Sequence, residues 1–287
     1  MNISNAKMHS WDEWARIALK MHFEEKNRLA EVEINSLLML LEDSFGISLE
    51  RLKNKPVLDL CCGWGRHSFI LAENGFNDVT AIDKSTVFIK KFEEIYFSQR
   101  QSKDININIV RSDFIDYNSK KPYSLIINMW SSFGVSDKHT ENICFLTKVH
   151  DSLSDNGVFV LDVINPLYLE KLLDQSKRED RLFFQNCNHW FLREWQGTQY
   201  LILAQISQIK KELFSYTLCQ FLKQNNSLSF DCEGKILQRF YSFVELKSIL
   251  VKIGFNILGV YSNFMGLPYS TDSPRIVIIA QKGVING

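Results

Sequence analysis

The sequence lacks several features that mark other classes of protein. Its 33 Lys and Arg balance its 33 Asp and Glu, so it has no basic excess of the kind that neutralises nucleic-acid phosphates. Its apolar runs fall well short of the roughly 18 residues that a membrane span needs. No apolar stretch typical of a signal peptide stands near the N-terminus. We therefore expect no nucleic-acid partner and no membrane association.

The cysteines offer neither a metal site nor a disulfide framework. They are Cys61, Cys62, Cys144, Cys187, Cys219 and Cys232. None of them forms a C-x-x-C pair, so we expect no zinc or other metal. The neighbours Cys61 and Cys62 cannot form an ordinary disulfide with each other. This usage is typical of a reduced protein of the cytoplasm.

What the sequence does contain is an alternation of short apolar strands and helices. It has 287 residues, 45% of them hydrophobic, which suits one large domain with an insertion. From residue 55 onward, β-branched runs alternate with segments of helical periodicity. This pattern predicts an α/β fold with a parallel sheet covered on both faces. The alternation breaks between residues 181 and 241, where apolar runs separated by polar turn residues predict an antiparallel meander.

These changes of pattern divide the chain into four predicted regions. We expect an N-terminal helical cap over residues 1–54 and an α/β core over 55–180. An antiparallel β insertion is expected over 181–241, as a substrate lid or a dimerisation surface, and the C-terminal part of the core over 242–287. The last region opens with Ser242-Phe243-Val244-Glu245, which reads as a helix capping box, and Gly254 is placed to close that helix.

The stretch that carries chemistry follows the first predicted strand. Val57–Leu60 leads into Cys61-Cys62-Gly63-Trp64-Gly65, and a helix is predicted from Arg66. The two glycines let the backbone approach a ligand where a Cβ would clash, and the helix start supplies free N–H groups. Asp83 ends the next predicted strand, about 20 residues after Gly63, where an acidic residue can hold ribose hydroxyls.

Two cofactor classes share this geometry, and charge distinguishes them. A dinucleotide site needs a third glycine, but Ser68 occupies that position. Asp59, in the strand that leads into the turn, would repel a pyrophosphate and attract an ammonium group. S-adenosylmethionine carries an ammonium, a sulfonium and a ribose but no phosphate. The charge pattern therefore favours S-adenosylmethionine over NAD.

At these residues the chain resembles the class I S-adenosylmethionine-dependent methyltransferases. The family pattern is roughly D-x-G-x-G-x-G, and here it runs from Asp59 to Gly65 with Cys61 in place of the first glycine. The segments 113–114, 128–134, 153–157 and 239–255 resemble later family segments in the expected order, the last of them those of a bacterial small-molecule group. The resemblance implies a Rossmann-like seven-stranded sheet, with N-terminal helices and the β insertion after strand five.

The resemblance also implies roles for individual residues. Asp113 would accept a hydrogen bond from the adenine amine, the Phe114 backbone would meet a ring nitrogen, and the 128–134 loop would close over the methyl donor. For Arg66 and His67, a structural role and a ligand contact both stay open. The cofactor contacts that we expect are Asp59, Cys61, Gly63, Trp64, Gly65, Asp83, Lys84, Asp113, Phe114 and Asn128.

The sequence says less about the methyl acceptor. An aromatic content of 13% and the aromatic insertion suit a lid over a compact substrate. Candidate acceptor contacts are Trp130, His189, Arg193 and Tyr241, and the candidate catalytic residues are His139 and Tyr241. We expect a monomer or homodimer that methylates a small molecule, at nitrogen more readily than at oxygen, and releases S-adenosylhomocysteine. The alternatives are a methyltransferase acting on a protein or tRNA, a cofactor-binding protein without catalysis, and a nucleotide-dependent oxidoreductase.

Overall fold

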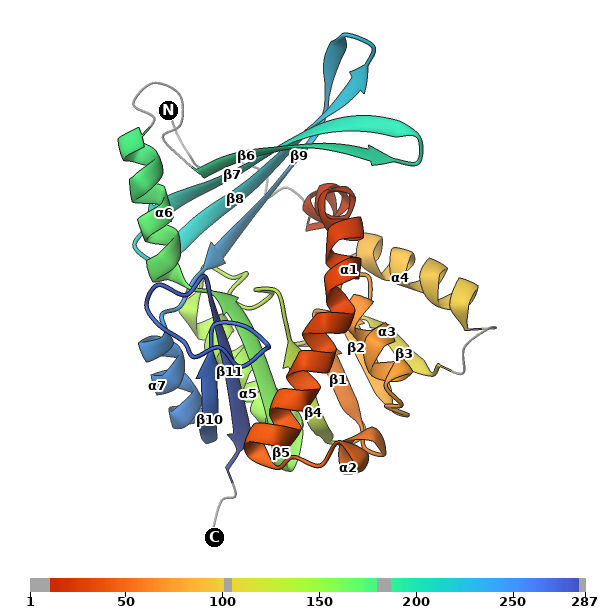
Figure 1. Cartoon of the computed structure of the whole chain (residues 1–287), viewed down its shortest axis with the longest axis vertical. Coiled ribbons are helices and arrows are strands. Elements are labelled where there is room, and N and C mark those ends of the chain that lie inside the picture. Colours follow the sequence, from red (N-terminus) through yellow and green to blue (C-terminus); the bar gives the residue numbers. More distant parts are fainter. Residues whose placement is uncertain (1–10, 101–104, 180–186, 284–287) are drawn as a thin grey trace.

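A computed structural model of the protein describes residues 11–100, 105–179 and 187–283. Within them, a seven-stranded sheet and a four-stranded antiparallel sheet stand one above the other, and the long first helix runs past both (Figure 1). The α/β class, the N-terminal helices and the antiparallel sheet after the fifth strand confirm the sequence prediction. Residues 181–186, at the start of the predicted insertion, lie outside the described residues.

The larger sheet has the strand order β10-β11-β5-β4-β1-β2-β3. Strands β1 to β5 run parallel to one another, whereas β11 is antiparallel to both β5 and β10. The carboxyl ends of the five parallel strands therefore meet at one edge, where α/β sheets bind their ligands. The strands are β1 (Val57–Leu60), β2 (Val79–Asp83), β3 (Ile107–Arg111), β4 (Tyr123–Asn128), β5 (Leu153–Ile164), β10 (Phe255–Tyr261) and β11 (Arg275–Lys282).

Helices cover both faces of this sheet. Successive residues of β4 face opposite sides, so Leu125 packs under α1, α3 and α4 while Ile126 packs under α5 and α7. Burial on both faces explains why the central strands read as unbroken apolar runs. The helices are α1 (Trp11–Phe45), α2 (Leu49–Lys53), α3 (Arg66–Glu73), α4 (Thr86–Gln99), α5 (His139–Ser152), α6 (Pro166–Glu179) and α7 (Phe243–Ile253).

The predicted ends of α7 are both confirmed. The Ser242 N–H donates to Glu245 Oε2 at 2.9 Å, and the Glu245 N–H donates to Ser242 Oγ at 3.3 Å, which together form the capping box. Gly254 ends the helix with φ of 115°. In the described part of the chain, no helix combines the length and the apolar content that crossing a membrane requires.

The second sheet packs its inner face against the first half of α1. Ile202 and Leu218 bury themselves there with Ala15 and Ala18. Strand β9 crosses α1 at Gly234, where a Cβ would lie 2.4 Å from the Trp14 Cα, so the crossing requires glycine. The sheet consists of β6 (Cys187–Trp195), β7 (Thr198–Lys210), β8 (Leu213–Gln224) and β9 (Ser227–Arg239).

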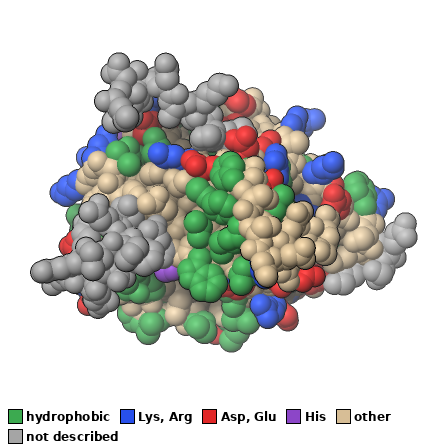
Figure 2. Space-filling model, turned by 90° about the horizontal axis from the view of Figure 1, so that it is seen from above, with side chains coloured by type: hydrophobic (Ala, Val, Ile, Leu, Met, Phe, Trp, Pro, Cys, Tyr) green, Lys and Arg blue, Asp and Glu red, His purple; other side chains and the backbone are tan. Residues whose placement is uncertain are grey.

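The outer face of this second sheet is apolar and open. Figure 2 shows hydrophobic side chains gathered on the molecule as seen from above. The exposed apolar side chains of the sheet include Trp190, Leu192, Leu203 and Phe230, with Trp190 67% exposed. Trp190 pairs with Leu203 across β6 and β7, and Phe230 belongs to β9. The apolar surface therefore extends over the whole width of the sheet.

Candidate active site

The turn after β1 is built from residues with positive φ. Cys61, Gly63 and Gly65 have φ values of 60°, 59° and 80°. Gly65 is also the N-cap of α3, and a Cβ there would lie 2.3 Å from the Phe92 ring, so no larger residue fits. Cys61 adopts the left-handed conformation without being glycine, at a cost of about 1 kcal/mol. The backbone at Cys61 therefore follows the left-handed path that a glycine would take, although the family pattern has glycine at this position and this chain does not.

Asp59 lies buried below this turn, with only 1% of its surface exposed. The Ser68 hydroxyl donates to its Oδ2 at 2.6 Å. Burial raises the pKa of Asp59 to about 6, and the Ser68 hydrogen bond opposes that shift. Ser68 stands where a dinucleotide site has its third glycine, and here it holds the carboxylate. A positively charged ligand group beside Asp59 would favour its ionised form.

Asp83 joins the end of β2 to the turn after β1. Its Oδ2 accepts from the Gly63 N–H at 2.9 Å, and its Oδ1 accepts from the Ser85 N–H at 2.8 Å. Burial raises the pKa of Asp83 to about 6, and these two hydrogen bonds oppose the shift. The Ser85 hydroxyl in turn donates to Asp12 at the start of α1. Each Asp83 oxygen keeps a lone pair for a further donor, such as a ribose hydroxyl.

The end of β3 adds Asp113 and Phe114 beside Asp83. The Ser112 N–H donates to the Asp83 carbonyl oxygen, which fixes the start of this segment. The Asp113 carboxylate is half exposed, with its Oδ2 4.0 Å from Lys84 Nζ. The Phe114 ring is buried against Phe145, with ring centroids 5.4 Å apart. A ligand can therefore contact the side chain of Asp113. At Phe114 it can contact only the backbone, because the ring is buried against Phe145.

Asn128 ends β4 with an unsatisfied acceptor. The residue is fully buried, and its Nδ2 donates to the Leu60 carbonyl oxygen at 2.8 Å. Its Oδ1 has no hydrogen-bond partner among the described residues. Leaving such a buried acceptor unpaired costs about 1–3 kcal/mol, so a donor on a bound ligand would be favourable here.

These groups together fit S-adenosylmethionine. Asp59 and Asn128 offer oxygen acceptors beside the glycine turn, and Asp83 and Asp113 follow along the same edge of the sheet. An ammonium and a ribose are the partners that such acceptors need, whereas a pyrophosphate would meet only negative charge at Asp59 and Asp83. The hydrogen-bond acceptors at this edge therefore match the cofactor that the charge pattern favours.

The loop after β4 is held in a strained conformation. Trp130 and Ser131 are successive non-glycine residues with φ of 62° and 56°. Asp162 of β5 accepts the Trp130 N–H at 2.7 Å, and Arg275 of β11 clamps the same carboxylate with two bonds of 2.6 Å. Strain of this kind persists only where neighbouring bonds enforce it, and it is typical of functional loops.

Glu33 of α1 ties this loop to the glycine turn. Its carboxylate accepts from Arg66 Nη1 at 2.5 Å, His67 Nε2 at 2.8 Å and Trp130 Nε1 at 2.9 Å. Although burial acts to raise its pKa, the His67 hydrogen bond and the Arg66 charge lower the pKa of Glu33 to about 2. Burial lowers the pKa of His67 to about 4, so its ring is neutral near pH 7. The sequence analysis did not identify Glu33. The one indication of it in the sequence is that an acidic residue stands on the apolar face of α1, between Ala30 and Leu37.

The side chain of Trp64, between the two glycines, contacts α1 and α4. Its Nε1 donates to Asn27 Oδ1 of α1 at 2.8 Å. Its ring centroid lies 5.9 Å from that of Phe23 and 5.6 Å from that of Phe88. Through Trp64, the glycine turn therefore packs against α1 and α4.

The two candidate catalytic residues lie in contact. His139 Nδ1 is 3.0 Å from the Tyr241 hydroxyl, and Asn142 Nδ2 donates to the same oxygen at 3.0 Å. Tyr241 is buried whereas His139, at the start of α5, is exposed. Burial raises the pKa of Tyr241, which keeps its hydroxyl protonated. The sequence spacing of 102 residues gave no indication of this contact.

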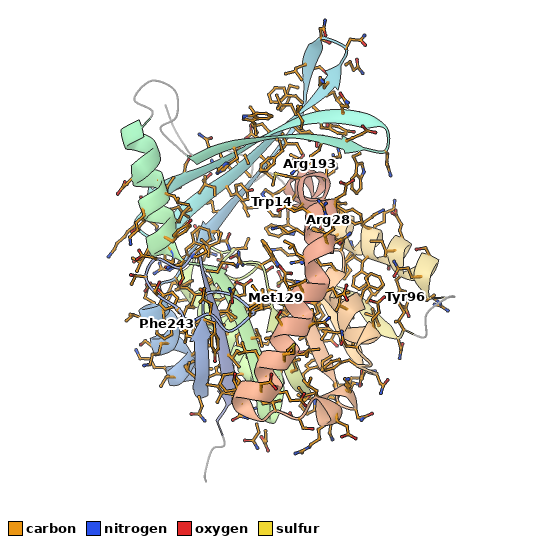
Figure 3. All side chains as sticks on the ribbon, viewed as in Figure 1. Trp14, Arg28, Tyr96, Met129, Arg193 and Phe243 are labelled. Atoms are coloured by element: carbon orange, nitrogen blue, oxygen red, sulfur yellow. The ribbon has the colours of Figure 1, made fainter. Side chains whose placement is uncertain are left out.

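The candidates in β6 lie apart from this cluster. His189 is exposed, and Arg193 donates from Nε to the Met21 carbonyl oxygen of α1 at 2.9 Å. In Figure 3, Arg193 and Trp14 lie at the upper end of α1, while Met129 lies lower, at the end of β4. The Arg193 side chain bonds to α1 and to β6, so it joins the second sheet to that helix.

Strand β9 reaches the β4 loop directly, which sequence reasoning did not foresee. Gln238 Nε2 donates to the carbonyl oxygens of Ser131 and Phe133 at 2.5 and 2.8 Å. The Arg239 N–H donates to the Gly134 carbonyl oxygen at 2.7 Å. The loop is thus bonded to α1 on one side through Trp130 and to the second sheet on the other.

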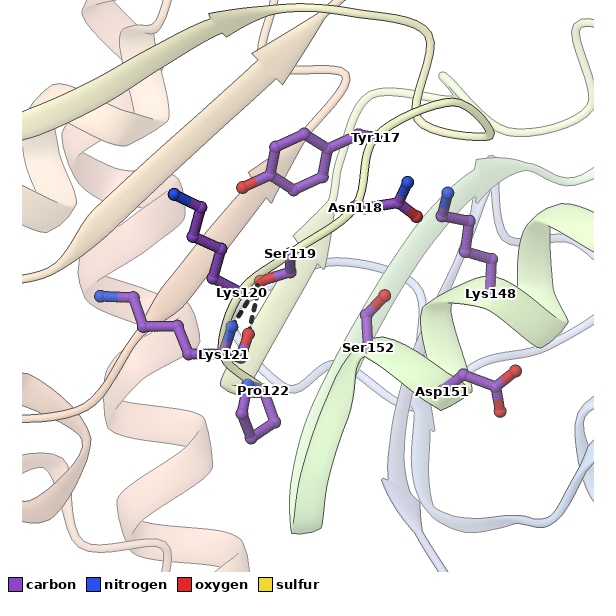
Figure 4. A pocket seen from close by; sticks show the side chains of 9 residues that line it. All are labelled: Tyr117, Asn118, Ser119, Lys120, Lys121, Pro122, Lys148, Asp151 and Ser152. Atoms are coloured by element: carbon purple, nitrogen blue, oxygen red, sulfur yellow. Dashed lines mark hydrogen bonds between the residues drawn. The ribbon is translucent and has the colours of Figure 1, made fainter.

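A cavity of about 350 Å³ lies at the opposite edge of the large sheet. Figure 4 shows its lining at the start of β4 and the end of α5. The lining residues are Tyr117, Asn118, Ser119, Lys120, Lys121, Pro122, Lys148, Asp151 and Ser152. None of the predicted site residues contributes to it, because those residues gather at the carboxyl ends of the strands.

Comparison with known proteins agrees with this geometry. Residues 51–226, more than half of the chain, match the family model described as a methyltransferase domain. The cypemycin N-terminal methyltransferase of Streptomyces sp is 28% identical over 120 residues, 42% of this chain and 46% of that protein. The tRNA U34 carboxymethyltransferase of Shewanella woodyi is 28% identical over 149 residues, 50% of this chain and 41% of that protein. The chain thus spans less than half the length of these curated relatives.

Solved structures share the fold over nearly the whole chain. A methyltransferase from Clostridium acetobutylicum has a TM-score of 0.71 at 17% identity, covering 96% of this chain and 99% of that one. The sugar N-methyltransferase KedS8 from Streptoalloteichus sp has a TM-score of 0.66 at 13% identity, covering 99% and 97%. The amino pentose methyltransferase CalS10 from Micromonospora echinaspora, solved with S-adenosylmethionine bound, has a TM-score of 0.61 at 11% identity, covering 98% and 100%.

Proposed function

We propose that this chain, which belongs to the methyltransferase-domain family and takes S-adenosylmethionine as its methyl donor, methylates a small-molecule acceptor at nitrogen in preference to oxygen. The observation that carries the proposal is the double anchoring of the β4 loop, to Glu33 of α1 and to Gln238 of β9. A loop anchored on both sides is better suited to hold a compact acceptor than to dock a large macromolecular surface. The sugar N-methyltransferase KedS8 among the similar structures supports nitrogen as the acceptor atom.

The residues of the chain contribute mainly by position. S-adenosylmethionine supplies a methyl group on a positively charged sulfur, which is a good leaving group. Asp59, Asp83 and Asn128 would bind and orient the cofactor, and the strained loop at Trp130 would define where the acceptor approaches. Aligning the reacting atoms in this way is a main contribution that a protein makes to such a displacement.

An amine acceptor must lose a proton, and His139 is the base that we propose. The Tyr241 oxygen has two lone pairs, and Asn142 fills one of them. When the Nδ1–H of His139 fills the other, Nε2 is left with the free lone pair that a base needs. Because Tyr241 stays a neutral phenol, its role is to orient the ring rather than to take up charge.

The proposed roles of the second sheet follow from its two faces. Its β9 strand bonds to the β4 loop, which supports the interpretation of residues 181–241 as an acceptor lid. Its open apolar face supports the homodimer alternative, which sedimentation velocity distinguishes from a monomer. The described cysteines Cys61, Cys62, Cys144, Cys219 and Cys232 are all unpaired, which supports our placement of the protein in the reducing cytoplasm.

The test is turnover of S-adenosylmethionine to S-adenosylhomocysteine with a panel of small amines and their matched alcohols. We expect product with one or more amines and little with the alcohols. His139→Ala should lower kcat by about 10²-fold or more with an unchanged affinity for the cofactor. Thr140→Ala, the exposed neighbour on the same turn, is the matched control. Methylation of tRNA or protein alone would favour the macromolecular alternative, and full kcat in His139→Ala would remove the base assignment.

A further inference from the structure

Arg239, at the end of β9, packs its side chain against Tyr241. The guanidinium carbon lies 5.0 Å from the centroid of the Tyr241 ring, where a cation is attracted to the aromatic face. The Phe133 ring of the β4 loop packs on the same tyrosine, with ring centroids 5.3 Å apart. Because Tyr241 is only 1% exposed, these neighbours leave its ring little freedom to turn.

The guanidinium itself is held by carboxylates from two other parts of the fold. Arg239 Nη2 lies 3.0 Å from Glu212, in the turn between β7 and β8, and 3.6 Å from Glu245, in the first turn of α7. The side chain of Arg239 is only 18% exposed, so salt screens these pairs less than pairs on the open surface. Its backbone N–H donates to Gly134 of the β4 loop. Arg239 therefore joins the second sheet, α7 and the β4 loop at the place where Tyr241 lies.

We propose that Arg239 is a positioning residue that acts on His139 through Tyr241. By holding the phenol ring, it keeps the Tyr241 oxygen where the Nδ1–H of His139 donates to it, which leaves the free lone pair of the base on Nε2. Glu212 extends this role to the second sheet, so the orientation of the base depends on where that sheet is seated. The inference deepens the proposed function and rests on it, since His139 is the base proposed there.

The first measurement needs no methyl acceptor. Heteronuclear NMR of the histidine rings distinguishes a proton on Nδ1 from one on Nε2, and the His139 signals are those that His139→Ala lacks. At about pH 8, where an ordinary imidazole is neutral, wild type should carry the proton on Nδ1. In Arg239→Met the signals should move toward the Nε2–H tautomer that imidazole prefers in water. Arg239→Lys, which keeps a cation beside Glu212, should restore them at least in part. Lys235→Met, on the exposed side of the same strand, is the matched control.

The second measurement is turnover with an amine that the panel of acceptors identifies. Arg239→Met should lower kcat by about tenfold and leave the KM of S-adenosylmethionine within about twofold of wild type. Glu212→Gln, which leaves Glu245 as a partner, should lower kcat by about threefold. The double variant should be no slower than Arg239→Met alone, because Glu212 acts only through the arginine. In the His139→Ala background, Arg239→Met should have no further effect.

Three results would overturn the inference. They are a wild-type His139 tautomer in Arg239→Met, a further loss of kcat when Arg239→Met is added to His139→Ala, and a loss of kcat that Arg239→Lys does not restore at all. If thermal unfolding shows that Arg239→Met does not fold, Glu212→Gln decides the same question with the same two measurements. Absence of turnover with every amine would instead overturn the proposed function, and the tautomer of His139 would still decide the inference.

Discussion

Asp83 gives the sharpest test of the cofactor site, because each of its oxygens already has a defined partner. The Gly63 N–H donates to Oδ2 at 2.9 Å and the Ser85 N–H donates to Oδ1 at 2.8 Å. Asp83→Ala removes both acceptors and leaves two backbone donors to water or to nothing. We expect the free energy of unfolding to fall by about 2 kcal/mol, roughly 1 kcal/mol for each lost bond.

The effect on cofactor binding should be larger than the effect on stability. If the two remaining lone pairs hold the ribose hydroxyls, each bond to the charged carboxylate contributes about 1.5–3 kcal/mol. Water partly replaces the lost acceptors, so we expect a net loss of about 2–4 kcal/mol, or roughly 30- to 1000-fold in affinity. Asp83→Asn should lose less, because its amide oxygen still accepts from one backbone N–H while its NH₂ group must face the other donor.

The pH dependence of binding gives a second measure of the same group. Burial raises the pKa of Asp83 to about 6, so wild type should lose affinity for S-adenosylmethionine as the pH falls through 6 and the carboxylate is protonated. In Asp83→Asn this dependence should shrink to the part that Asp59 contributes, whose pKa is also about 6.

Titration calorimetry measures the affinities, and urea unfolding measures the stability. Asp155→Ala is the control. It removes an exposed carboxylate near the start of β5, far from the end of β2 where Asp83 lies, and should change neither the affinity for the cofactor nor the stability. A dissociation constant within twofold of wild type in a folded Asp83→Ala protein would refute the reasoning, because the ribose would then be held elsewhere.

Three further outcomes follow from the packing around the turn. Glu33→Ala leaves Arg66 as a buried charge without its partner, so urea unfolding should show a loss of about 3–5 kcal/mol, against less than about 0.5 kcal/mol for the exposed Glu31→Ala; equal losses would contradict the network. The folded protein has a pKa of Glu33 lowered to about 2, so ionised Glu33 should stabilise the fold fully at pH values above the ordinary pKa of an unfolded glutamate. That stabilisation should disappear as the pH falls toward 2, and acid unfolding of Glu33→Gln should lack this dependence. Gly65→Ala places a Cβ 2.3 Å from the Phe92 ring at φ of 80°, and thermal unfolding should show a loss of at least about 1–3 kcal/mol; an unchanged melting temperature would show that the turn can move.

Local pattern was sufficient to predict the sheet and the turn. The central strands bury both faces, so they read as unbroken apolar runs, and Asp83 and the glycines mark where two of them end. Ser242 and Glu245 lie three residues apart, and a capping box depends on nothing beyond that spacing. Features of this kind are decided within a few residues, which is why one sequence is enough to predict them.

The ion pairs that shape the site were beyond prediction for a physical reason. Glu33 meets Arg66 across 33 residues, and Asp162 meets Arg275 across 113. Each pairing depends on how α1 or β11 packs, and one charged residue in a helix or strand looks like any other until that packing is known. The same holds for Gln238, whose amide supports the β4 loop from a strand of the second sheet.

The position of α1 has a consequence for how the protein is made. The first half of this helix buries much of its apolar side against the second sheet, and Trp14 packs against Tyr216 of β8 with ring centroids 6.0 Å apart. About 200 residues separate those partners, which corresponds to roughly 10–40 s of synthesis on a ribosome. Throughout that interval Ala15 and Ile17 lack the partners Ile202 and Leu218 that the second sheet supplies. Synthesis that ends before β8 would therefore yield a product with exposed apolar surface on the first half of α1, which chaperones and proteases recognise.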